Sequence, residues 1–300
     1  MDAWIALSIM AAAFQTLRFM LQKTLSMGVL SAGGATFARF AYSAPFAGLL
    51  ACAYVAWTGE ALTGPGGLFW VYVVAGGLAQ ILATWCVVLL FAQRNFAVGI
   101  TFKKTEVIQT ALVGFVVLGD RISLPGMIAI LVGLAGVLVL SDVPGGAARW
   151  ARRVMNRAAG LGLASGALFA VSAVAYRGAT LEVASSDALT RALVSVATVT
   201  AAQTLGMALW LRWREPGQLT RVWAARGRAL WMGLASIGGS LGWFTAFTLQ
   251  NAAYVFAVGQ VEVIFSLIAS VLVFHERISA RELWGIGLLT ASILLLVAVG

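Results

Sequence analysis

The feature that most constrains this chain is a series of long, almost uninterrupted apolar runs separated by short polar or Gly/Pro-containing breaks. A helix of about 20 mostly apolar residues is long enough to cross the hydrocarbon core of a bilayer. Strands of a membrane barrel would instead alternate polar and apolar residues over about ten positions. The runs therefore predict an all-α membrane protein with spans at 3–24, 34–57, 69–92, 96–118, 123–141, 158–181, 187–212, 227–250, 254–274 and 280–299.

The composition agrees with this interpretation. Residues of the AVILMFWYC class make up 61% of the 300 positions, only 10% are charged, and the mean hydropathy is +0.94. A soluble domain cannot bury that much apolar surface. The net charge of +9 comes from basic residues that lie mostly between the apolar runs. This distribution is typical of cytoplasmic membrane loops, and we expect no nucleic-acid partner.

Lysine and arginine are denser in the odd-numbered connections than in the even-numbered ones. Cytoplasmic loops carry this excess, so the odd connections are predicted to be cytoplasmic and both termini periplasmic. The first apolar run lacks the basic start and the cleavage site of a secretory signal, and we expect it to be retained as the first span.

A segment of the first half recurs in the second half without a gap. Residues 106–123 align with 262–279 at a constant offset of 156, with seven of 18 positions identical. Five predicted spans in each copy is an odd number, so the second copy must enter the membrane from the opposite side. The sequence thus predicts two inverted five-helix repeats, 1–142 and 158–300, joined by a basic cytoplasmic linker at 143–157. Such repeats suit alternating access around one polar cavity at bilayer depth.

The repeated motif is a Glu that begins a helix, followed fourteen residues later by a carboxylate, as in Leu-Gly-Asp-Arg-Ile-Ser at 118–123. It resembles the drug/metabolite transporter superfamily and, more narrowly, its EamA-type ten-helix exporters. That family usually places Pro after the first Glu, whereas Val107 and Val263 stand here. A helix kink is therefore not expected at these points.

This resemblance implies a carrier in the bacterial inner membrane that exports amino acids and related small metabolites, most like the aromatic amino-acid exporter branch. The partners would be a small-molecule substrate and membrane lipid, with the protein as a monomer. The alternatives are a multidrug or nucleotide-sugar carrier of the same fold, or a non-transporting membrane subunit.

Charged residues inside a span are costly and need partners or water, so they are candidates for function. The sequence places such residues at Arg18, Arg39, Lys103, Lys104, Glu106, Arg191 and Glu262. Lys103 and Glu106 are three apart on one helical face and are predicted to pair. Glu106, Glu262, Arg39 and Arg191 are the gating or coupling candidates. Snorkelling or anchoring at the interface, or a purely structural tie between helices, is the alternative for each.

The predicted third and eighth spans carry the polar and aromatic groups expected around an amino-acid substrate. Gln80, Thr84 and Trp85 recur there as Ser236, Ser240, Trp243 and Thr245. Glycines at 76, 77, 238, 239 and 242 allow close helix approach or leave room for a ligand. Ordinary helix packing is the alternative. The substrate-binding candidates are Phe14, Gln15, Gln80, Thr84, Trp85, Phe102, Lys103, Tyr176, Ser240, Trp243, Tyr254 and Gln260.

No pattern in the sequence predicts an enzyme. Cys52 and Cys86 lie in apolar runs without a neighbouring His, and the sole histidine is His275, so we expect neither a metal site nor a disulfide. The sequence contains no Walker-type phosphate loop, zinc-protease motif or nucleophile elbow. We therefore expect no cofactor and no ATP-driven pumping by this chain.

Overall fold

The computed structural model describes residues 2–28, 30–60, 64–91, 102–140, 157–265, 268 and 280–299. Within these ranges the regular structure is helical and there is no strand. The helices are α1 (Ala3–Gly28), α2 (Ala32–Thr58), α3 (Gly67–Phe91), α5 (Glu106–Leu118), α6 (Leu124–Leu140), α8 (Arg157–Leu181), α9 (Ala188–Arg214), α10 (Gln218–Ala224), α11 (Arg226–Leu249), α12 (Ala252–Gly259) and α14 (Ala280–Val299).

Five of the described helices are long and apolar enough to cross a membrane: Ala3–Ser26, Ala32–Thr58, Gly67–Leu90, Arg157–Leu181 and Ala188–Arg214. Shorter apolar helices lie at Glu106–Leu118, Leu124–Val139, Ala252–Phe265 and Leu283–Ala298. The predicted all-helical membrane class is therefore confirmed. The short helix α10 was not predicted, because it occupies the basic connection at 213–226 that carries no apolar run.

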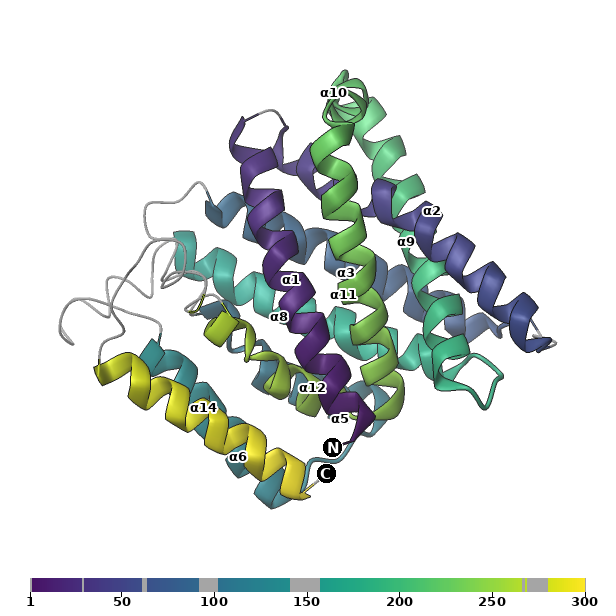
Figure 1. Ribbon diagram of the computed structural model, residues 1–300. Helices are drawn as coiled ribbons and strands as arrows, with labels where there is room; N and C mark the ends of the chain where they lie inside the picture. Colours follow the sequence, from purple (N-terminus) through teal and green to yellow (C-terminus); the bar gives the residue numbers. More distant parts are fainter. Residues whose placement is uncertain are drawn as a thin grey trace.

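The helices pack in long pairs. α1 lies along α11, α3 along α8, α2 along α9, and α6 along α14 at the edge of the bundle (Figure 1). Both ends of the chain lie at one end of the bundle, and α10 lies at the opposite end (Figure 1). Below, we call these the terminal side and the α10 side.

Two of the predicted glycines allow close crossings between paired helices. A Cβ at Gly76 of α3 would lie 2.8 Å from the Tyr176 ring of α8, and a Cβ at Gly238 of α11 would lie 2.9 Å from the Phe14 ring of α1. Neither distance leaves room for a side chain. The predicted role of these glycines in close helix approach is confirmed.

The first copy of the repeated motif is a turn between two helices. Gly119 ends α5 in the left-handed region, with φ 69°, and its N–H donates to Phe115 O at 3.2 Å. Ser123 accepts the Gly126 N–H at the start of α6, at 3.2 Å. In the second copy, residues 266, 267 and 269–279 lie outside the described residues. So do His275 and most of the basic linker.

Candidate functional site

The centre of the site is a buried ion pair at the start of α5. The Lys103 ammonium lies 2.9 Å from both carboxylate oxygens of Glu106, and the two side chains are only 3% and 7% exposed. The two residues are three apart in the chain, and the turn just before α5 brings these groups together. The predicted pair is present, and it is buried inside the bundle rather than at an exposed helix end.

Glu262 brings the second half of the chain to the same place. The Lys104 ammonium lies 3.2 Å from its carboxylate, and Gln15 of α1 donates a hydrogen bond to that carboxylate at 2.9 Å. Glu106 and Glu262 are the equivalent residues of the two aligned segments, so the repeat converges on one cluster of charges. Burial strengthens such pairs because little water screens them.

A small pocket lies among these groups. Its lining consists of Gln15, Lys103, Glu106, Phe169, Trp243, Phe256, Gly259 and Glu262. Its volume is about 20 Å³, which is room for about one water molecule. The Lys103 ammonium lies 4.9 Å from the centroid of the Phe169 ring, and Trp243 packs edge-on against Phe256 at 5.5 Å. Aromatic rings thus line this small polar pocket together with the charged groups.

Three of the predicted substrate-binding residues line this pocket: Gln15, Lys103 and Trp243. Phe14 precedes Gln15 on α1, and its ring packs against Gly238 of α11. Tyr176 is buried in the neighbouring crossing of α3 and α8, where it stacks on Phe244 at 4.4 Å. Its hydroxyl donates to Gln80 Oε1 at 2.9 Å.

The other predicted substrate-binding residues lie elsewhere or make no contact with the pocket. Trp85 packs against Trp210 between α3 and α9 at 4.8 Å. Thr84 accepts a hydrogen bond from Arg39, and the Tyr254 hydroxyl accepts the Ser123 N–H at 3.1 Å. Phe102, Ser240 and Gln260 are not among the described residues that line the pocket.

The two arginines predicted for gating have different environments. Arg39 is 5% exposed and donates to Thr84 Oγ1 at 2.8 Å, which ties α2 to α3. Arg191 donates to Thr180 O at 2.7 Å, which ties the start of α9 to the end of α8. Neither is among the described lining residues, and they do not form an equivalent pair around the pocket.

Sequence reasoning missed a hydrogen-bonded layer on the terminal side of the pocket. Arg177 of α8 pairs with Asp120 at 3.1 Å. It also donates to Phe247 O at 2.7 Å and Gln250 O at 2.9 Å. Arg177 thus ties the α5–α6 turn and the end of α11 to α8. The sequence did offer one indication of this layer, because the Asp120 carboxylate recurs in the second copy of the motif as Glu276.

A second layer lies on the α10 side. The Ser31 hydroxyl, at the start of α2, donates to the Glu215 carboxylate at the end of α9. The Ser31 N–H also reaches Gln218 Oε1 of α10, at 3.4 Å. Contacts that hold the helix ends together therefore exist on both sides of the pocket.

Comparisons with known proteins give a family and a fold. Residues 156–298 match the EamA-like transporter family. The comparison with curated proteins gave no match. A solved structure described only as "Crystal structure of protein" covers 97% of this chain and 99% of its own, with 17% identity and a TM-score of 0.62. That likeness shows the fold alone. With the apolar helices, this match indicates an integral membrane protein whose residues 156–298 are similar to the EamA-like transporter family.

Proposed function

We propose that the whole chain is a secondary transporter of the EamA type. It exports amino acids, aromatic ones among them, and related small metabolites across the bacterial inner membrane by alternating access. The family match at 156–298 supports the transporter class. The observation that carries the proposal is the convergence of Glu106 and Glu262, one from each aligned segment, on one buried polar pocket.

Helix packing supports the two-repeat arrangement. Matching the halves in order pairs α1 with α8, α2 with α9, α3 with α11, α5 with α12 and α6 with α14. If each helix is replaced by its counterpart, the contact of α1 with α11 corresponds to that of α8 with α3. The contact of α1 with α12 likewise corresponds to that of α8 with α5. All four contacts are present in the structure. The contact of Phe14 with Gly238 becomes that of Tyr176 with Gly76, and each residue is displaced by 162 positions (176 − 14 and 238 − 76).

The chemistry of the pocket suits an amino acid. A lysine ammonium can bind the substrate carboxylate, a glutamate can bind the substrate ammonium, and aromatic rings can pack on an apolar side chain. A volume of about 20 Å³ is too small for any amino acid, so the pocket has to widen before substrate enters. In this proposal the Arg177 layer and the Ser31–Glu215 layer open in turn, each exposing the pocket to one side.

Transport can be measured with the full chain in proteoliposomes loaded with labelled tryptophan, phenylalanine or leucine, at two pH values. We expect saturable release by the wild type and a loss of about tenfold or more in Glu262→Gln, because a buried ion pair loses one charge. Glu182→Gln, which removes a carboxylate from the α8–α9 connection, is the matched control and should transport normally. Release of none of a broad amino-acid panel would refute the proposal.

The same vesicles separate the substrate classes. Inhibition of release by an excess of unlabelled amino acid, but not by cationic aromatic compounds, is expected. The reverse pattern would identify a multidrug carrier of the same fold.

A further inference from the structure

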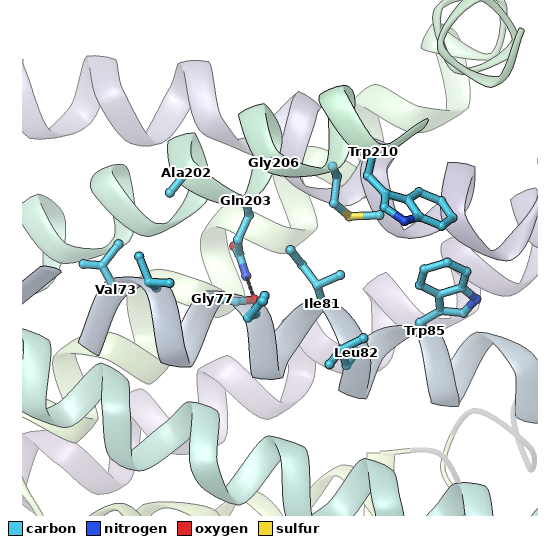
Figure 2. Close-up of a pocket in the computed structure, with 12 residues that line it drawn as sticks. Val73, Gly77, Ile81, Leu82, Trp85, Ala202, Gln203, Gly206 and Trp210 are labelled. Atoms are coloured by element: carbon cyan, nitrogen blue, oxygen red, sulfur yellow. Dashed lines mark hydrogen bonds between the residues drawn. The ribbon is translucent and has the colours of Figure 1, made fainter. Parts of the chain in front are cut away.

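A second, larger cavity lies between α3 and α9, away from the charged pocket. It encloses about 390 Å³ and is a groove between the two helices. Figure 2 shows Gln203 extending from α9 towards Gly77 of α3, with Val73 on one side and Ile81 and Trp85 on the other. On its α3 rim, Val74 and Leu78 are 63% and 48% exposed, so the groove opens on the outer surface of the bundle.

The lining of this groove is almost entirely apolar. None of the described residues that line it is charged, and Trp85 and Trp210 form an edge-to-face pair at one end. A zwitterion or an ion would lose its water there without gaining an oppositely charged partner, so the lining selects against free amino acids. Gly206 leaves space in the groove wall, because a Cβ at that position would meet nothing within 4 Å.

Gln203 is the polar residue in this lining, and the oxygen of its side-chain amide makes no hydrogen bond with the described residues. It is 2% exposed, and its Nε2 donates to Gly77 O at 3.1 Å and to Gln80 Oε1 at 3.0 Å. Because a backbone carbonyl can only accept, the amide nitrogen must be the atom that faces Gly77. The Oε1 atom has no hydrogen-bond partner among the described residues.

We propose that the α3–α9 groove binds a neutral aromatic molecule that carries one N–H or O–H donor and enters from the lipid phase. The ring lies on the apolar walls beside Trp85 and Trp210, and the donor reaches Gln203 Oε1. A lipid acyl chain would fill the volume but would leave that oxygen without a partner. The site goes beyond the proposed transport function, and its binding equilibrium can be measured without any transport.

Binding is tested with the full chain in nanodiscs and tritiated indole as the probe. The wild type should bind indole saturably, and Gly206→Leu, which projects into the groove, should abolish that binding. Gly287→Leu is the matched control, since a Cβ at Gly287 of α14 also meets nothing within 4 Å. It should bind like the wild type. Absence of saturable binding to the wild type, or unchanged binding in Gly206→Leu, would overturn the proposal.

A second test compares two ligands on the wild-type protein, so it does not depend on whether a variant folds. 1-Methylindole has the same rings without the N–H, and we expect it to bind wild type about tenfold more weakly, as the loss of one hydrogen bond predicts. In Gln203→Leu the two ligands should bind equally. Equal affinities in the wild type would refute the Gln203 contact.

Discussion

Lys104 and Glu262 are 158 residues apart in the chain, yet the Lys104 ammonium lies 3.2 Å from the Glu262 carboxylate in the interior of the bundle. This pair joins the two halves of the chain where the aligned segments begin, because Lys104 lies two residues before the first segment and Glu262 is the first residue of the second. The Lys103–Glu106 pair beside it lies within one turn of the chain.

The Lys104–Glu262 contact should appear as an energetic coupling between distant parts of the sequence. We expect Lys104→Met and Glu262→Gln each to lower the free energy of unfolding by about 3 kcal/mol, since each removes one member of a largely buried ion pair. The double variant should lose less than the sum. A double-mutant cycle from chemical unfolding in detergent measures this coupling, and additive effects would contradict the contact.

The crossing of α3 and α8 should be intolerant of one added methyl group. Gly76→Ala is expected to lower the free energy of unfolding by about 1–3 kcal/mol, because its Cβ would overlap the Tyr176 ring. Gly160→Ala on α8 is the control, as a Cβ there meets nothing within 4 Å, and alanine favours helix. Thermal unfolding compares the two. Equal stability would show that the helices do not cross this closely.

The Arg177 layer should restrain the end of α11. Arg177→Gln removes the ion pair with Asp120, and we expect faster amide hydrogen exchange at 247–251, where Phe247 and Gln250 lose their donor. The matched control is Arg221→Gln on the exposed face of α10. An unchanged exchange rate at 247–251 in the Arg177 variant would show that these hydrogen bonds do not stabilise the end of α11.

Asp187 should make the stability of α9 depend on pH. Burial opposes ionisation of this N-cap residue, but hydrogen bonds from the Thr190 N–H and hydroxyl, at 2.8 and 2.9 Å, outweigh it and lower the pKa of the carboxyl. A lowered pKa contributes stability above the unfolded value of about 3.9. That stability is lost as the pH falls through the folded pKa.

The pH effect can be separated from the cap itself. Asp187→Ala should cost about 1 kcal/mol near neutral pH, whereas Asp187→Ser keeps a capping oxygen that does not titrate. Unfolding curves measured down to low pH should show the gap between wild type and Asp187→Ser closing. A gap that does not change with pH would contradict the ionised cap.

The amino-acid sequence predicts the helices well because each apolar run is a local property of the chain. It also predicts the Lys103–Glu106 pair, since residues three apart in the chain meet in a helix or in the turn that precedes α5. It does not predict which lysine reaches Glu262, because that depends on how the helices rotate against one another. Arg39 and Arg191 have similar positions in the two halves but different partners, so position in a repeat does not determine contact.

The size of the pocket was also beyond sequence reasoning. Phe169, Trp243 and Phe256 come from three helices, and only their packing decides how much space remains between the charges. The polar residues were recognisable from their cost in a membrane. Trp243 was recognisable from its place in the repeat, but Phe169 and Phe256 resembled any other lipid-facing or core position until the helices were placed.

The edge pair of α6 and α14 has a mechanical consequence. Ser292 of α14 donates to Ala129 O of α6 at 2.6 Å, and Gly133 and Gly136 bring the two backbones close together. The pair contacts the remaining described helices mainly through α5 and α12. The two helices are therefore expected to move as one rigid body. Rearrangement of the neighbouring helices would tilt the pair without separating α6 from α14.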